Sequence, residues 1–358
     1  MIQYDQIEKS LNLVADRMMT LKSNGMKEKY PISLIDINCW EWPQGVGIFG
    51  LYKYYEVSGR KEILDFLVHW FDQRLKEGVL ERNVNTTAPM LTLAYVYEKT
   101  GKKEYLQYIQ EWCSWIMDEK GLIRTGDECF QHMITGNPND NEILIDTIFM
   151  ALLFLAKAGV LLGRQDCIDE VNYQIMTHIK YLLNKEEGLF YHGFNFKRND
   201  NYGKVMWGRG NSWYTVAVME LMEMTEIDPA IKRYFLSVYR NQTAALKKYC
   251  SPESGLWHTV LDDDTSYIEI SGSAAFLCGI IHGVRSGVLD RSGYDALINK
   301  GLKSLLDYID EDGTVRNVSY GTPIGMSGEF YKNIICCPMT YGQALMILAL
   351  QEALLYLK

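Results

Sequence analysis

The sequence of 358 residues lacks the features that mark several large classes of protein. No run of Lys and Arg exceeds two residues and the net charge is −9, so nucleic acid is not an expected partner. The longest apolar run, around 143–162, contains Asp146 and Lys157, which favours a buried helix over a membrane span. The N-terminal residues show no charged region followed by an apolar stretch, so we expect a cytoplasmic protein without a signal peptide.

Cysteine is present without a metal-binding or disulfide pattern. Of eight Cys only Cys336 and Cys337 are neighbours, and no C-x-x-C pair occurs, which suits thiols in a reducing compartment. The segment Gly45–Gly50 matches G-x-G-x-x-G, but neither a preceding strand nor a βαβ unit accompanies it, so no dinucleotide is expected. Its glycines are expected to let inner helices pack closely. No cofactor or metal ion is expected.

A short phrase recurs along the chain, in which an apolar run is followed by charged residues, Gly and a short apolar stretch. The copies lie at 76–80, 118–123, 185–190, 252–257 and 310–315. A second phrase, Tyr-Glu-x-x-Gly-x-Lys-Glu, occupies 55–62 and 97–104. Self-similarity at roughly 40–70 residues indicates a repeated helical hairpin.

Helical periodicity covers most of the chain, and the helices alternate in character. Six are apolar on nearly all sides and six have a polar face, which predicts an inner ring within an outer one. The fold class is therefore all-α, an (α/α)6 barrel of six hairpins forming one domain over residues 1–358, preferred over an open solenoid. The expected helices are 3–22, 44–57, 61–76, 86–99, 103–117, 142–161, 165–183, 211–225, 229–249, 271–286, 293–308 and 339–356.

Polar and aromatic residues cluster just before or within the first turns of the six apolar helices. Parallel inner helices would open all six N-termini at one end of the barrel. Their partial positive charges and unpaired N–H groups would favour an anionic ligand there. Aromatic side chains around this mouth are suited to stacking on sugar rings.

Asp146 is the sharpest single candidate because apolar residues flank it on both sides. Loss of hydration would raise its pKa and let it hold a proton near neutral pH. Hydrogen bonds from backbone N–H groups at a helix N-terminus would lower the pKa instead. The residues alone leave both outcomes open.

Two further features are expected at the same end. His192 follows the third copy of the turn phrase. Arg209 stands between Trp207 and Trp213, where its guanidinium would pair with a carboxylate and pack on an indole ring.

The chain resembles glycoside hydrolase family 105, the unsaturated rhamnogalacturonyl hydrolases, and more distantly the unsaturated glucuronyl hydrolases of family 88. The resemblance spans nearly the whole chain. It rests on several motifs in one order, namely Gln44-Gly45-Val46, Asn83-Val84-Asn85-Thr86-Thr87, Leu144-Ile145-Asp146, Gly188-Leu189-Phe190-Tyr191-His192, Trp207-Gly208-Arg209-Gly210-Asn211-Ser212-Trp213 and Ser271-Gly272-Ser273.

The resemblance implies an (α/α)6 barrel that removes a Δ4,5-unsaturated uronic acid from the non-reducing end of oligosaccharides left by polysaccharide lyases. The expected partner is thus an anionic unsaturated oligosaccharide, with an unsaturated rhamnogalacturonan disaccharide first. By the same resemblance Asp146 would protonate C4 of the vinyl ether and then activate water for attack at C5. The hemiketal formed would open and release the neighbouring sugar.

The resemblance also gives roles to other residues. Asn85 stands where some relatives carry a second Asp, and it would orient the water or a ring hydroxyl. One carboxyl group that is first acid and then base suffices for hydration, whereas ordinary glycosidases need two. The residues expected to bind substrate are Trp42, Gln44, His132, His192, Trp207, Arg209 and Trp213, with the segment 131–141 helping to choose the leaving sugar.

Other functions remain open from the sequence. An unsaturated glucuronyl hydrolase acting on glycosaminoglycan or ulvan fragments would use the same chemistry. A sugar epimerase or a conventional inverting glycosidase would use the same scaffold. The glycosidase needs a second carboxylate, for which the candidates are Glu41, Asp140, Glu142 and Glu269. A barrel that only binds carbohydrate is the third alternative. The oligomeric state is left open.

Overall fold

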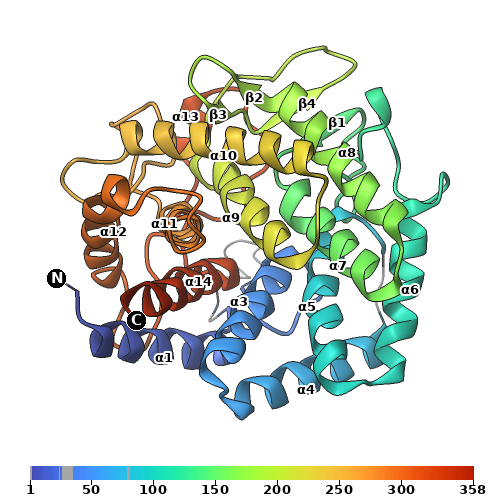
Figure 1. The fold of residues 1–358 in the computed structure, drawn as a ribbon, viewed down its shortest axis with the longest axis horizontal. Coiled ribbons are helices and arrows are strands. Elements are labelled where there is room, and N and C mark those ends of the chain that lie inside the picture. Colours follow the sequence, from blue (N-terminus) through green and yellow to red (C-terminus); the bar gives the residue numbers. More distant parts are fainter. Residues whose placement is uncertain (1, 24, 26–34, 79–80) are drawn as a thin grey trace.

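Six inner helices form a closed ring in the computed structural model, which describes residues 2–23, 25, 35–78 and 81–358 (Figure 1). Each packs on the next, α3 on α5, α5 on α7, α7 on α9, α9 on α11, α11 on α14, and α14 back on α3. Their bounds are α3 (Trp42–Ser58), α5 (Val84–Thr100), α7 (Leu153–Leu162), α9 (Gly208–Met224), α11 (Ile270–Arg285) and α14 (Thr340–Leu357).

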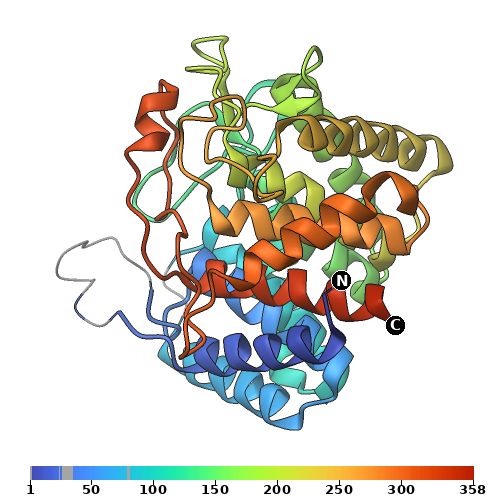
Figure 2. The ribbon, with the colours of Figure 1, turned by 90° about the vertical axis from the view of Figure 1, so that its left-hand side faces the viewer.

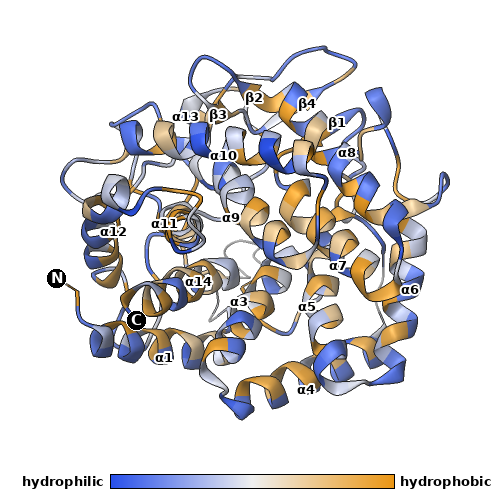
Figure 3. Cartoon of the chain, viewed as in Figure 1, coloured by the Kyte–Doolittle hydropathy of each residue, from blue (hydrophilic) through white to orange (hydrophobic). Residues whose placement is uncertain are grey.

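A second set of helices covers the inner ring, each buried along one face and exposed along the other. Figure 3 shows their apolar residues turned toward the ring and their polar residues turned outward. They are α1 (Tyr4–Thr20), α4 (Lys61–Glu77), α6 (Lys103–Met117), α8 (Gln165–Leu182), α10 (Pro229–Tyr249) and α12 (Arg291–Leu306). The expected (α/α)6 barrel is confirmed, and no described helix is long and apolar enough to cross a membrane.

The inner helices are buried on all sides, as their composition predicts. In α11 every residue from Ile270 to Val284 is buried. Glycine permits this packing at two positions of the Gly45–Gly50 segment. A Cβ added at Gly45 would lie 2.6 Å from Pro89 N on α5, and one at Gly50 would lie 2.9 Å from Ala344 Cβ on α14.

The recurring turn phrases mark the ends of helices. Gly59 and Gly101 are left-handed C-caps of α3 and α5, with φ of 67° and 65°. Gly188 and Gly255 also have positive φ, a conformation that glycine adopts without the strain imposed by a Cβ. In the phrase at 76–80, residues 79 and 80 lie outside the described residues.

The expected helix 142–161 begins later than its apolar pattern suggests. Residues Glu142–Leu144 form strand β1, which pairs antiparallel with β4 (Gly193–Asn195), so their backbone groups bond across a ladder. A π-helical turn, η2 (Ile148–Leu152), precedes α7. A second hairpin joins β2 (Leu183–Asn184) to β3 (Leu189–Phe190).

Two short helices were not expected, the 3-10 helix η1 (Gly126–Glu128) and a helix at the open end of the barrel. Helix α13 (Gly328–Lys332) stands among the loops at the end opposite the C-terminus of α14 (Figure 2). Ser327 caps it by accepting the N–H of Phe330. Lys332 holds it in place by binding Asp263, at 3.1 Å, and Thr265, at 2.9 Å.

Candidate active site

The first turns of the inner helices meet through aromatic side chains. Trp42, the first residue of α3, stacks on Tyr341 of α14 with ring centroids 4.6 Å apart. It also meets Trp213 of α9 edge-on at 6.4 Å. Trp42 is half-buried and Trp213 has no exposed surface. The N-terminal turns of α3, α9 and α14 therefore meet at one end of the barrel.

Protein side chains already occupy several of these helix N-termini, contrary to the expectation of six with unpaired N–H groups. Glu41 accepts from Trp42 N at the start of α3, and Asn83 forms a capping box at the start of α5. Glu269 accepts the N–H groups of Ser271 and Gly272 on α11. By contrast, η2, α9 and α14 have no side-chain cap. Positive potential from uncapped N–H groups is thus concentrated on these three.

Pairing of β1 with β4 brings Asp146 and His192 together. Leu144 lies opposite Gly193, and Ile145 N donates to His192 O at 3.0 Å. Two residues beyond β1, Asp146 Oδ2 lies 3.4 Å from His192 Nε2. Asp146 Oδ1 accepts a hydrogen bond from Trp213 Nε1 at 3.0 Å. About 15% of the Asp146 side chain is exposed, so solvent reaches it while its neighbours are buried.

The pKa of the Asp146 carboxyl is lowered. Burial alone would raise it, but the His192 imidazole beside the carboxylate outweighs burial, and the charge of Arg209 adds to this effect. Of the two outcomes that the sequence leaves open, the structure thus favours the lower pKa, although not through helix N–H groups. The free protein holds Asp146 as a carboxylate.

His132 stands behind Asp146. Its Nδ1 lies 2.8 Å from Thr147 Oγ1, and the ring is 4% exposed. Burial lowers its pKa to about 4, against the charge of Asp146. His132 is therefore a neutral imidazole at physiological pH.

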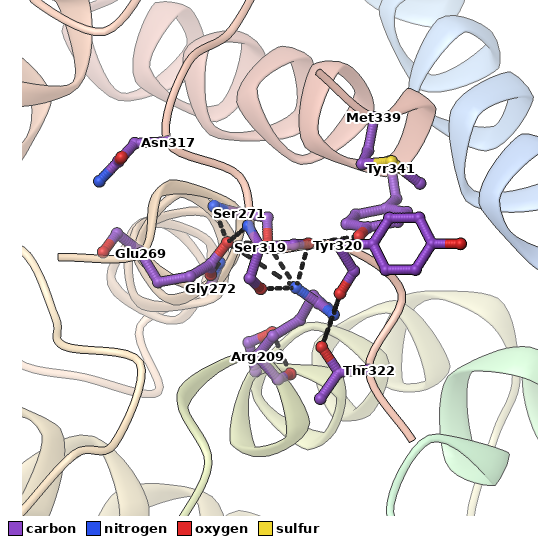
Figure 4. Close-up of polar contacts among 12 residues, drawn as sticks. Arg209, Glu269, Ser271, Gly272, Asn317, Ser319, Tyr320, Thr322, Met339 and Tyr341 are labelled. Carbon is purple, nitrogen blue, oxygen red and sulfur yellow. Dashed lines mark hydrogen bonds and ion pairs between the residues drawn. The ribbon is translucent and has the colours of Figure 1, made fainter. Parts of the chain in front are cut away.

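Arg209 is enclosed by protein (Figure 4). Its guanidinium lies between the rings of Trp207 and Tyr341, at 4.6 and 4.7 Å, and has no exposed surface. Nη1 donates to Ser319 O at 3.0 Å, and Nη2 donates to Thr322 Oγ1 at 3.0 Å. Both terminal nitrogens thus donate hydrogen bonds to the segment 319–322.

An ion pair lies behind this arginine. Glu269 Oε1 lies 3.8 Å from Arg209 Nη1, and Glu269 is 1% exposed. The same carboxylate accepts from Ser319 N at 2.9 Å. Arg209 and Glu269 together fix the segment that follows Asn317 at the open end of the barrel.

The remaining predicted residues differ in their accessibility. Gln44 is fully buried, and its amide donates to Asp36 O at 2.8 Å. Asn85 is half-buried in the first turn of α5, and its side chain makes no hydrogen bond to another described residue. Trp207 is 2% exposed and packs on His192 with ring centroids 4.3 Å apart.

Several buried polar atoms here have no hydrogen-bond partner among the described residues. They are Asp146 Oδ2, His192 Nε2, Trp207 Nε1 and Arg209 Nε. Buried polar groups are rarely left unpaired. Their concentration around one carboxylate is what a site for a polar ligand requires.

The alternative second carboxylates are in different states. Glu269 is paired with Arg209 and accepts the N–H of Ser319. Glu142 accepts hydrogen bonds from Tyr202 and Asn195. Asp140 is exposed on its loop. Glu41 is half-buried and accepts from Thr135 Oγ1 at 2.5 Å, and burial raises its pKa.

Sequence reasoning missed Tyr331 and gave no role to Tyr341. Tyr331 Oη lies 2.7 Å from His192 Nδ1, although the two residues are 139 positions apart. Its helix of five residues is too short to give a periodic signal.

The cluster also lies apart from two surface hollows of about 540 and 260 Å³, which α4, α6 and adjoining segments line without any predicted site residue.

Known proteins resemble this chain in sequence and in fold. Unsaturated rhamnogalacturonyl hydrolase YesR of Bacillus subtilis (strain 168) is 29% identical over 297 residues, 82% of this chain and 83% of that protein. A possible member of family GH105 from Klebsiella pneumoniae is 36% identical with a TM-score of 0.93, covering 100% of this chain and 95% of that one.

A more distant structure shares the fold. The unsaturated glucuronyl hydrolase of Bacillus sp. GL1 is 16% identical with a TM-score of 0.72, covering 97% of this chain and 96% of that one. The expected resemblance to families 105 and 88 is thus confirmed. The family model described as Glycosyl Hydrolase Family 88 matches residues 12–357, and the chain accordingly belongs to that family of glycoside hydrolases.

Proposed function

We propose that this protein removes a Δ4,5-unsaturated uronic acid from the non-reducing end of oligosaccharides left by polysaccharide lyases. The observation that carries the proposal is the Asp146 carboxylate, which faces Trp213 Nε1 and His192 Nε2 and is still reached by solvent. The unpaired polar atoms around it support a polar ligand. The similarity to the unsaturated rhamnogalacturonyl hydrolase YesR, named above, supports this substrate class.

The reaction is a hydration in which one carboxyl group acts twice. Protonated Asp146 gives its proton to C4, and the C4=C5 electron pair forms the new C–H bond. Water adds its oxygen to C5 and returns a proton to Asp146. The hemiketal then opens: its hydroxyl becomes the C5 carbonyl as the bond from C5 to the ring oxygen breaks, and the ring oxygen takes the proton. The hemiacetal left at C1 collapses to an aldehyde, its bond to the glycosidic oxygen breaks, and the neighbouring sugar leaves with that proton.

Asp146 must gain its first proton when substrate binds, because its pKa in the free protein is lowered. A uronate carboxylate beside Asp146 would supply the like charge that raises a carboxyl pKa. His192 and Trp213 then stabilise the negative charge that returns to Asp146 as the proton moves to C4. In this proposal Asn85, whose side chain makes no hydrogen bond to another described residue, orients the attacking water.

The leaving sugar is proposed to be the rhamnose of an unsaturated rhamnogalacturonan disaccharide, with glycosaminoglycan or ulvan fragments as the alternative. The loop 131–141 and the segment 319–322 lie at the open end and would contact this sugar.

The proposed location is the cytoplasm. Cys113 and Cys167 are thiols with sulfur atoms 3.4 Å apart, which suits a reducing compartment.

The test is an absorbance screen with pectin-, ulvan- and glycosaminoglycan-derived unsaturated disaccharides. Hydration removes the conjugated C=C–COO⁻ band, so absorbance should fall with the pectin-derived substrate first. Asp146→Asn should lower the rate by about 10²–10⁴-fold, whereas Asp264→Asn, at an exposed loop carboxylate, should not. Stable absorbance with every substrate, or a fully active Asp146→Asn variant, would refute the proposal.

Glu41 supports a second candidate function, that of a conventional inverting glycosidase. A half-buried carboxyl with a raised pKa is suited to act as a general acid. A conventional inverting glycosidase would then cleave saturated substrates and lose that activity in Glu41→Gln. Turnover restricted to unsaturated substrates would exclude it.

A further inference from the structure

The side chain of Tyr331 reaches the active site from helix α13. It is 1% exposed and packs on Trp207, with ring centroids 5.8 Å apart. Its hydroxyl oxygen accepts the backbone N–H of Gly325 at 3.0 Å. On its other side the same oxygen lies 2.7 Å from His192 Nδ1.

The direction of the bond to His192 follows from counting hydrogens. The N–H of Gly325 can only donate, so it uses an acceptor site on the Tyr331 oxygen. Burial raises the pKa of Tyr331, and the phenol keeps its single proton. His192 Nδ1 is the nearby acceptor for that proton. If Nδ1 carried its own hydrogen, the phenol would accept two bonds and its proton would have no partner among the described residues.

The opposite nitrogen of the imidazole faces Asp146. With Nδ1 accepting from Tyr331, a neutral ring must carry its hydrogen on Nε2. Nε2 lies 3.4 Å from Asp146 Oδ2, longer than an ordinary N–H···O bond. Neither atom has a hydrogen-bond partner among the described residues, so each is available to the other or to a ligand beside the pair.

We propose that Tyr331 is a positioning residue that holds His192 as the neutral tautomer with its hydrogen on Nε2. His192 is then a fixed hydrogen-bond donor to Asp146. The consequence for catalysis rests on the proposed function, because donors aimed at Asp146 stabilise the charge that forms when its proton moves to C4. Among the described residues, His132 and Arg209 are the other groups whose charges act on Asp146.

Nuclear magnetic resonance of the free protein tests the tautomer without any substrate. The sequence has six His, and ¹⁵N-histidine labelling separates protonated from bare ring nitrogens, with His192 identified by its loss in His192→Gln. We expect a protonated Nε2 and a bare Nδ1 at neutral pH. A hydrogen on Nδ1 of the unmodified protein would overturn the proposal, and this measurement needs no variant of Tyr331.

The variant Tyr331→Phe removes the donor to Nδ1 while retaining the ring. Its His192 signals should shift toward forms protonated on Nδ1. The matched control is Tyr214→Phe, which removes a buried hydroxyl that donates to Phe235 O of α10 at 2.9 Å and does not contact His192 Nδ1. The control should retain the His192 signals of the unmodified protein. Unchanged His192 signals in Tyr331→Phe would contradict the assignment.

Kinetics provide the second measurement. With the unsaturated disaccharide, Tyr331→Phe should lower kcat about tenfold and leave KM within about twofold, because Tyr331 acts on the transition state through His192. The pH profile of kcat should also change shape. Equal loss in Tyr214→Phe would indicate a merely structural effect. Absence of turnover in the unmodified protein would reject the proposed function, while the resonance signals would still decide the tautomer.

Discussion

Trp213 Nε1 donates to Asp146 Oδ1 at 3.0 Å, a hydrogen bond that joins the first turn of α9 to the segment preceding α7. The donor is fully buried and the acceptor is reached by solvent. Such a bond favours the ionised carboxylate and fixes its plane. Trp213 therefore bears on the chemistry of Asp146 in addition to filling the wall of the site.

Replacing this indole tests that role. Trp213→Phe keeps an aromatic ring but removes the N–H, so the pKa of Asp146 should rise. Because the reaction needs protonated Asp146, the alkaline limb of the pH–rate profile should move to higher pH. A hydrogen bond to a charged group contributes about 1.5 kcal/mol. Losing that amount in the transition state corresponds to about a tenfold lower kcat. Trp257→Phe is the control, since its Nε1 donates to Leu246 O away from Asp146. An unchanged pH profile in Trp213→Phe would contradict the prediction.

Arg209 should be necessary for stability as well as for activity. Arg209→Ala leaves Glu269 as a buried carboxylate without its nearest cation. Removing one partner of a buried pair costs about 3–5 kcal/mol, a loss that urea unfolding would measure. Arg316→Ala, at an exposed pair with Asp310, should cost less than about 1 kcal/mol. Similar losses in the two variants would disprove a special role for Arg209.

Gly45 should not tolerate even a methyl group. The added Cβ of Gly45→Ala would lie 2.6 Å from Pro89 N, a backbone atom that cannot turn aside. We expect a loss of about 1–3 kcal/mol from overpacking. Gly293→Ala is the matched control within α12, where the nearest atom is Asp290 Oδ2 at 3.9 Å. There the better helix propensity of Ala should stabilise by about 0.5–1 kcal/mol. Thermal unfolding distinguishes the two.

Stability should depend on pH through a charge cluster at the far end of the barrel. His282 Nε2 lies 2.8 Å from Glu223 Oε1. Burial alone would lower the pKa of His282, but Glu223, Glu352 and Glu220 raise it above 6.5. Its stabilisation is therefore complete below pH 6.5 and is lost as the pH rises through the raised pKa.

Glu223 gives the opposite dependence. The hydrogen bond from His282 is the main cause that lowers its pKa to about 2, so its contribution is present above pH 4.5 and declines as the pH falls toward 2. His282→Gln should flatten the stability curve above about pH 6.5 in urea unfolding. His69→Gln, at an exposed position, should leave the curve unchanged. A curve equally steep in His282→Gln would rule out this source.

The sequence predicts the barrel well because each helix carries its own periodic pattern. The expected ranges 103–117 and 229–249 coincide with α6 and α10. The start of α7 is the main error, because β1 pairs with β4, and this partner lies some fifty residues away in an irregular segment. A local pattern does not report such pairing.

The site is predictable only in part for the same reason. Asp146 and Trp213 lie beside inner-helix N-termini, which parallel packing brings together. Arg209 binds the segment 319–322, which belongs to a long loop. The path of such a loop leaves no periodic pattern in the sequence, so this contact could not be predicted. Tyr331 comes from that region too. Residues beside recognisable local motifs, such as Asp146 and His192, can thus be named from the sequence, whereas contacts made by the long segment after Asn317 cannot.

The stacking of Trp42 on Tyr341 has a consequence for biosynthesis. These residues belong to the first and the last of the inner helices in chain order. A chain emerging from the ribosome carries Trp42 long before α14 has been made. Until then the ring stays open between α11 and α3, and Arg209 lacks the phenol ring that covers one of its faces. The enzyme should therefore acquire its binding capacity in a single late step of folding, after nearly the entire polypeptide has been synthesised.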